Sequence, residues 1–256
     1  MSIDNGHNLK RLLQMQPQGV VWTTKYLVKQ GFSASLLQKY RDNQWLEAIG
    51  HGAMKKTGED IHYLGGIFAL QKQLNLSIHP GAKTALTILG RAHFLELGRP
   101  RLYLFGETKE KLPSWFLNYN WGVDIDYFRS SFLPSEEAMS DFTYNNYQVS
   151  IASPVRSLLQ CLYLVPQKQD LEEAYQFMLG LTDLRPDRTQ ALLEKCSSIK
   201  VNRLFLYLAE KSGHAWYKHI NQNKINLGHG DREIIKNGVY NAKYKITIPI
   251  TLEHNA

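Results

Sequence analysis

Apolar side chains along residues 8–64 are spaced first as in helices and then as in strands. Leu9, Leu12 and Leu13 stand at i, i+3 and i+4, which predicts a short amphipathic helix over residues 8–14. Residues 45–49 and 61–64 alternate apolar and polar positions, which predicts two strands. The segment between them, residues 50–60, contains glycines and two adjacent lysines. It is predicted to form the wing of a two-stranded ribbon.

Capping residues divide the stretch between these elements into two short helices. Thr23 or Thr24 can cap the first helix, because a hydroxyl accepts a hydrogen bond from a free N–H in the first turn. Gly31 can end that helix in the left-handed conformation, and Ser33 can cap the next helix. Two helices joined by a three- to four-residue turn that contains glycine are typical of a helix-turn-helix.

The same stretch contains enough apolar side chains for the core of a small DNA-binding module. Its predicted core residues come from both helices and from the first strand: Tyr26, Leu27, Leu36, Leu37, Tyr40, Trp45 and Leu46.

Beyond residue 64 the pattern mixes helices and strands after a predicted break at Gly65-Gly66. Helices begin at Ser153-Pro154, a serine cap followed by a proline in the first turn, and at Asp170, which resembles a capping box with Glu173. Other predicted helices cover residues 67–74, 81–90, 187–197 and 200–211. Predicted strands cover residues 101–105, 124–128, 146–151 and 244–249, the last with Tyr244, Ile246 and Ile248 on its apolar face.

These elements predict an α+β fold with two domains. Residues 1–65 would form an N-terminal winged helix-turn-helix. Residues 66–256 would form a larger mixed α/β domain with a helical C-terminal part. A chain of 256 residues is long enough for either one large domain or two smaller ones.

Charge adds a mild preference for an anionic partner. The net charge is +7 and the isoelectric point about 9.2. Residues 1–65 contain eight Lys and Arg against five Asp and Glu, and residues 150–256 contain fourteen against ten. No block of like charge stands out, so a slightly basic cytosolic protein without nucleic acid is an equally good interpretation of charge alone.

The remaining composition favours a cytoplasmic protein without a membrane span. Cys161 and Cys196 lie within apolar helical patterns, where buried thiols are expected rather than a disulfide or a metal site. The polar residues 1–8 do not resemble a signal peptide, and no apolar run approaches the ~18 residues of a membrane helix.

DNA binding is the first chemistry that the pattern suggests. A recognition helix places its N-terminal side chains against base edges, where glutamine can pair with adenine and serine is permissive. Lysine and arginine suit phosphates, which position a protein without reading the sequence. The candidate DNA contacts are Thr23, Ser33, Ser35, Gln38, Lys39, Arg41, Lys55 and Lys56. A winged helix that contacts only other proteins remains open as an alternative.

Two further functions also remain open. Asp124 and Asp126 could bind a divalent metal as in a nuclease, with Glu136 or Glu137 as a further ligand. Carboxylates that face solvent on a strand are the more common explanation of such a pair. The other alternative is a transcription factor whose C-terminal domain senses a ligand. No catalytic residue, metal or cofactor is otherwise predicted.

Several short motifs, in this order and spacing, resemble the AbiEi antitoxins of type IV (abortive infection) toxin–antitoxin systems over nearly the whole chain. Besides the helix-turn-helix, they are Gly50-His51-Gly52, Ile78-His79-Pro80-Gly81, Leu89-Gly90-Arg91-Ala92-His93, Ser153-Pro154-Val155-Arg156, Lys200-Val201-Asn202-Arg203-Leu204-Phe205 and Leu227-Gly228-His229-Gly230. The chain departs from the family at Val155 and Gln160, where acidic residues are usual.

The resemblance implies a bifunctional protein. Residues 1–65 would bind repeats in double-stranded promoter DNA and repress their own operon. Residues 66–256 would form a C-terminal antitoxin domain that counters a nucleotidyltransferase-like toxin. A stable complex with the toxin is not required in such a system. The expected protein is not an enzyme and is a monomer in solution.

Overall fold

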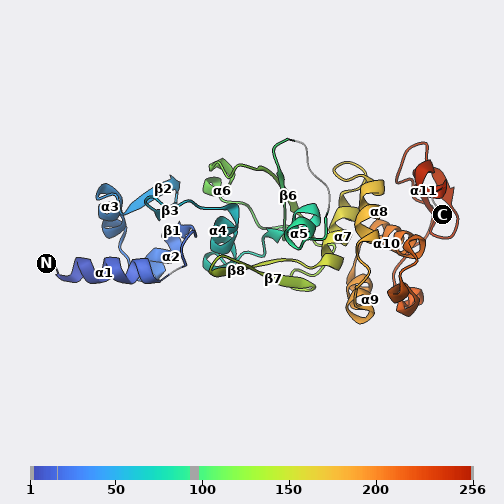
Figure 1. Cartoon of the computed structure of the whole chain (residues 1–256), viewed down its shortest axis with the longest axis horizontal. Coiled ribbons are helices and arrows are strands. Elements are labelled where there is room, and N and C mark those ends of the chain that lie inside the picture. The colour runs from blue at the N-terminus through green and yellow to red at the C-terminus, as the bar shows by residue number, and fades with distance from the viewer. Residues whose placement is uncertain (1–2, 16, 93–97, 255–256) are drawn as a thin grey trace.

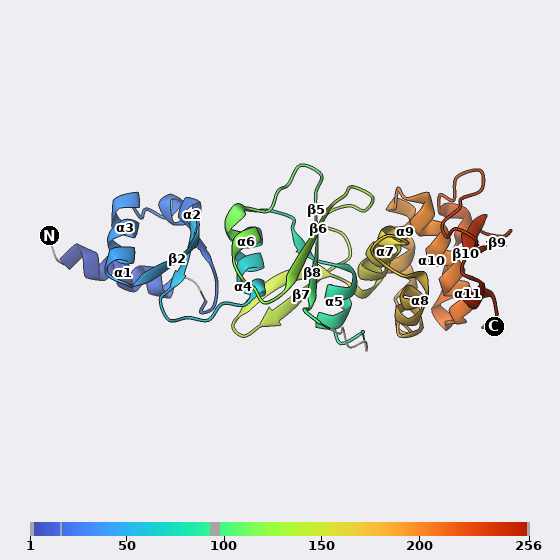
Figure 2. The same cartoon turned by 90° about the horizontal axis from the view of Figure 1, so that it is seen from above.

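A computed structural model describes residues 3–15, 17–92 and 98–254 of the chain, with the side chains of residues 8–15, 17–92 and 98–253. His93, the last residue of one motif above, lies outside these ranges. The elements form three groups in a row along the long axis, with α1 and α11 at opposite ends (Figures 1 and 2).

The N-terminal group contains three helices and a small sheet. Its elements are α1 (Ile3–Gln14), β1 (Trp22–Thr23), α2 (Thr24–Lys29), α3 (Ala34–Asp42), β2 (Leu46–Gly50) and β3 (Ala53–Lys56). The strands are antiparallel in the order β1-β3-β2. The predicted caps are confirmed. Thr23 caps α2, Ser33 caps α3, and Gly31 between them has φ 93°.

Two predictions for this group are wrong. The second strand is β3, and residues 61–64 form none. His51 and Gly52 make a tight turn, with Gly52 at φ 80°, so the chain returns beside β2 at once. Trp45, a predicted core residue, is 46% exposed, whereas the neighbouring Leu46 is 2% exposed.

The middle group contains the main sheet. Its elements are α4 (Tyr63–Phe68), η1 (Ala69–Gln73), β4 (His79–Pro80), α5 (Ala82–Ile88), β5 (Arg101–Gly106), α6 (Ser114–Asn118), β6 (Asp124–Arg129), β7 (Met139–Tyr144) and β8 (Tyr147–Ala152). Strand β5 lies between β4, to which it is antiparallel, and β6, to which it is parallel. Strands β7 and β8 form a separate hairpin in register over their whole length.

The break predicted at Gly65-Gly66 is also wrong, because both glycines lie buried inside α4. A Cβ on Gly65 would stand 2.1 Å from the carbonyl oxygen of Gly19, so the glycine permits close contact between α4 and residues 19–21. The backbone N–H of Val21 donates to the carbonyl of Gly65 at 3.3 Å. The N-terminal and middle groups therefore share one core across residue 65.

The C-terminal group is mainly helical. Its elements are α7 (Pro154–Leu164), α8 (Leu171–Leu179), α9 (Pro186–Lys195), α10 (Ile199–Ser212), η2 (Ala215–His219), η3 (Gln222–Lys224), β9 (Val239–Asn241), β10 (Ile246–Ile248) and α11 (Ile250–His254). The predicted caps Ser153 and Asp170 are confirmed at α7 and α8. The apolar face of the final strand, Tyr244, Ile246 and Ile248, is buried as predicted.

Helix α7 connects the middle and C-terminal groups, because it packs against α5 on one side and against α8 and α10 on the other. All its residues except Pro154 and Tyr163 are buried. Among the described residues, none of the helices has the length and apolar character to span a bilayer.

Candidate nucleic-acid interface

The turn between α2 and α3 is anchored in the core by a buried aromatic side chain. Phe32 is 1% exposed, and its backbone N–H donates to the carbonyl of Leu27 at 3.1 Å. The guanidinium carbon of Arg11, in α1, lies 5.2 Å from the centre of the Phe32 ring. The same guanidinium donates a hydrogen bond to the carbonyl of Gln30 at 2.7 Å. These contacts fix the relative positions of α1, α2 and α3.

Helix α3 has one buried and one exposed face. Leu37 and Tyr40 are 1% and 4% exposed and anchor the helix in the core. Four of the predicted DNA contacts, Ser33, Ser35, Gln38 and Lys39, are exposed. Ser33 is occupied in part by the helix itself, since its hydroxyl accepts from the N–H of Leu36 at 3.1 Å and lies 3.0 Å from the Ser35 hydroxyl.

The amide of Gln38 makes hydrogen bonds on α3 at both ends. Its nitrogen donates to a carboxylate oxygen of Asp42 at 2.7 Å, and its oxygen accepts from Arg41. Both bonds are exposed, so exchanging them for bonds to a base costs little free energy. Gln38 is therefore oriented by its neighbours and remains available to a ligand.

Three predicted contacts have partners within the protein. Thr23 is 2% exposed, and its hydroxyl caps α2 by accepting from the N–H of Tyr26 at 3.3 Å. The Lys55 side chain is 12% exposed and donates to the carbonyl of Glu59 at 3.0 Å. Lys56 lies 3.5 Å from a Glu59 carboxylate oxygen. These three side chains stabilise α2 and the end of the β2–β3 hairpin.

Lys25 and Lys29 of α2 are exposed cations that the sequence prediction did not include. They stand four residues apart, which places them on one side of the helix. In helix-turn-helix proteins the first helix crosses the DNA backbone. The i, i+4 spacing of the two lysines is the sequence signal that could have indicated them.

The carboxylates that suggested a nuclease have basic partners. Asp126 lies 2.9 Å from Arg101 and 3.5 Å from Lys168, and Asp124 lies 3.6 Å from Arg99. Within residues 8–15, 17–92 and 98–253, no group of three or more His, Cys, Asp or Glu side chains could hold a metal ion. The ion pairs account for the two aspartates without a metal.

The arginines of two C-terminal motifs are buried and bind backbone carbonyls. Arg203 is 1% exposed and donates to the carbonyls of Leu227 at 2.7 Å, Gly230 at 2.7 Å and Lys245 at 3.0 Å. Arg156 donates to two carbonyls of the loop before β7, at 2.6 and 2.7 Å. Burial lowers the pKa of Arg156 to about 10, so it is still charged near neutral pH. These motifs therefore have a structural role.

Gln160, one of the two departures from the family pattern, belongs to a buried network of hydrogen bonds. Its side-chain oxygen accepts from the N–H of Ala82, and its nitrogen lies 3.1 Å from His79 Nε2. His79 Nδ1 lies 2.7 Å from the carbonyl of Ser77, which can only accept, so the proton is on Nδ1 and Nε2 accepts from Gln160. Burial, and then the charge of Arg156, lowers the pKa of His79 to about 3.

Two family models together match most of the chain. Residues 99–249 match the family described as "Transcriptional regulator, AbiEi antitoxin, Type IV TA system", and residues 5–97 match the N-terminal domain model of an AbiEi transcriptional regulator. No curated protein matches. Among solved structures, the RV2827C protein from Mycobacterium tuberculosis is similar, with a TM-score of 0.59 and 15% identity over 94% of this chain and 89% of that one. At that identity the likeness concerns the fold alone.

Proposed function

The chain belongs to the AbiEi family of antitoxins and transcriptional regulators of type IV toxin–antitoxin systems. From this premise we propose that it represses its own promoter and also counters a nucleotidyltransferase-like toxin. Residues 1–65 contact the promoter DNA and residues 66–256 carry the antitoxin activity. This division is one of function, since α4 spans residue 65.

The exposed polar face of α3 is the observation that supports DNA binding most strongly. The elements run in the order helix, strand, helix, helix and a two-stranded hairpin, which is the order of a winged helix-turn-helix. In such a module α3 enters the major groove, and its N-terminal side chains meet the base edges. Ser33, Ser35 and Gln38 read bases. Lys39 and Arg41, with Lys25 and Lys29, contact phosphates.

Titration of promoter DNA across a salt series tests these roles. Lys39→Ala removes an ammonium group and should weaken binding to every DNA sequence. It should also reduce the slope of log K against log salt by about 0.9, the value for one phosphate contact. Gln38→Ala should instead lower affinity for the promoter more than for unrelated DNA. Equal losses on both duplexes would exclude base reading by Gln38. Lys218→Ala, an exposed lysine in η2, is the matched control for charge.

The antitoxin activity is tested in the full chain, because a cut at residue 65 would divide α4 and its core. A double substitution, Lys39→Ala with Gln38→Ala, removes DNA contacts and leaves residues 66–256 intact. We expect this variant to restore growth when the adjacent toxin gene is induced and the variant is expressed from an independent promoter. Failure to restore growth at wild-type protein levels would contradict the proposed division of function.

A further inference from the structure

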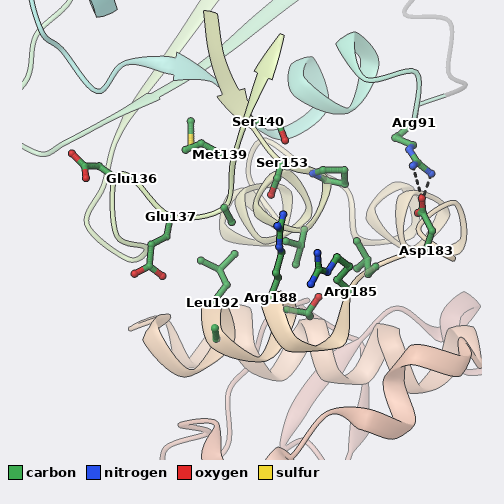
Figure 3. Close-up of a pocket in the computed structure, with 16 residues that line it drawn as sticks. Arg91, Glu136, Glu137, Met139, Ser140, Ser153, Asp183, Arg185, Arg188 and Leu192 are labelled. Atoms are coloured by element: carbon green, nitrogen blue, oxygen red, sulfur yellow. Dashed lines mark hydrogen bonds and ion pairs between the residues drawn. The ribbon is translucent and has the colours of Figure 1, made fainter.

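A groove of about 490 Å³ opens between the middle and C-terminal groups. Its lining residues are distant in sequence from α3. Its walls come from residues 136–140 before and within β7, residues 153–155 at the start of α7, and residues 183–192 before and within α9 (Figure 3). Its volume is within the range of pockets that bind small molecules, ~300–1,000 Å³. The proposed DNA contacts do not involve any of these residues.

One part of the groove is apolar. Val155, Leu184 and Leu192 are 6%, 9% and 1% exposed, and they line it together with Ala138 and Met139. These side chains come from three separate segments of the chain, so the apolar surface is a product of the fold. It suits the apolar body of a ligand, since removing such a body from water is favourable.

Two arginines of α9 and the turn before it supply positive charge. Figure 3 shows the side chains of Arg185 and Arg188 extending into the groove below Ser153. Arg185 has one ion pair, with Asp187 at 2.9 Å, and both of these side chains are more than 60% exposed. An exposed ion pair of this kind contributes little to the stability of the fold, so Arg185 can exchange it for a ligand. In the described part of the chain, Arg188 has neither a hydrogen bond nor an ion pair from its side chain.

Other charged side chains of the groove already have ion-pair partners. Arg91 is committed to Asp183, to which it donates two hydrogen bonds at 3.0 and 2.6 Å. Glu137 pairs with Lys195. In Figure 3 the carboxylates of Glu136 and Glu137 lie on the left, away from Arg185 and Arg188.

The start of α7 adds to the positive potential near Arg188. Ser153, Pro154 and Val155 line the groove, so the N-terminal end of this eleven-residue helix faces it. A helix N-terminus attracts anions through the aligned peptide dipoles, and an arginine can bind a carboxylate or phosphate with two parallel hydrogen bonds.

We propose that the groove binds a small ligand with one anionic end, a carboxylate or a phosphate, and an apolar body. The anionic end lies between Arg185 and Arg188 at the start of α7. The apolar body lies against Val155, Leu184 and Leu192. The proposal adds a ligand site to the protein and does not depend on the proposed DNA binding.

Calorimetric titration of the full chain with four probes tests this. Octanoate and phenyl phosphate each combine an anion with an apolar body. Inorganic phosphate lacks the body, and octanol lacks the charge. We expect octanoate or phenyl phosphate to bind at one site, about tenfold or more tightly than inorganic phosphate and octanol. The stronger of the two anionic probes identifies the head group.

Variants connect that binding to the groove. Arg188→Gln should weaken the bound probe by about tenfold or more, because it removes a charge-assisted pair. It should leave the melting temperature unchanged, since the Arg188 side chain is exposed. Arg185→Gln should also weaken binding, and Arg232→Gln, in an exposed loop, should not. Absence of binding by both anionic probes, or equal binding by wild type and Arg188→Gln, would overturn the proposal.

Discussion

At the level of single residues, several motif side chains maintain the fold through buried hydrogen bonds to distant parts of the chain. Arg203 holds three carbonyls from two separate segments, and Gln160 joins His79 to the start of α5. The sequence could not predict these roles, because each depends on partners 24 to 81 residues away in the chain. The local caps Thr23, Ser33 and Ser153 were predictable, because their partners lie three residues away.

Replacing Arg203 with methionine should destabilise the protein strongly. The carbonyls of Leu227, Gly230 and Lys245 would lose their donor while remaining beside an apolar side chain. We expect a loss of about 3 kcal/mol in the free energy of unfolding, measured by urea titration. Lys218→Met, at an exposed position of η2, should change it by less than about 0.5 kcal/mol. Equal effects of the two substitutions would show that the Arg203 hydrogen bonds are unimportant.

His79 should make stability depend on pH. Its pKa is lowered by burial from 6.5 to about 3, so the unfolded state binds the extra proton between these values. Its contribution is fully present above pH 6.5 and decreases as the pH falls. Between pH 6.5 and about pH 5 the free energy of unfolding should fall by about 2 kcal/mol from this group. His79→Gln, which cannot titrate, should show a smaller fall. A fall as large as in the wild type would contradict this assignment.

At the scale of elements, length and clear periodicity decided what could be predicted. Helices α7, α8, α9 and α10 and the strands β5, β6 and β8 follow from apolar spacing and caps. Helix α6 has only five residues, and the three residues of β9 include no buried side chain, so neither gives a clear periodic signal. Strand β7 has no fully buried side chain, and the alternation along residues 140–144 is only between half-buried and exposed positions, so its apolar signal is weak.

The glycines of α4 show how packing between elements can override local preference. Gly65→Ala favours helix locally but would place a methyl group against the Gly19 carbonyl, where the space is already filled. We expect thermal and urea unfolding to reveal a loss of about 2 to 3 kcal/mol. Gly180→Ala, at the end of α8, is the control, since no atom lies closer than 3.4 Å to the new Cβ. The prediction fails if both variants are equally stable.

At the scale of the whole molecule, the N-terminal and C-terminal groups lie at opposite ends of a row, and the main sheet lies between them (Figure 2). Helix α3 and the groove near α9 are therefore separate surfaces. The excess positive charge is divided in the same way, with +3 in residues 1–65, eight against five, and +4 in residues 150–256, fourteen against ten. For the proposed DNA binding, a surface of such modest charge would need base contacts as well as phosphate contacts to be specific.

We propose above all that α3 reads the promoter of this protein's own operon. A competition experiment measures the dissociation constant of the full chain for a duplex from that promoter in the presence of a shuffled duplex of equal composition, near 0.15 M salt. We expect a preference for the promoter of about a thousandfold or more, and a smaller preference with Gln38→Ala. Equal affinity of the wild-type protein for the two duplexes would contradict it.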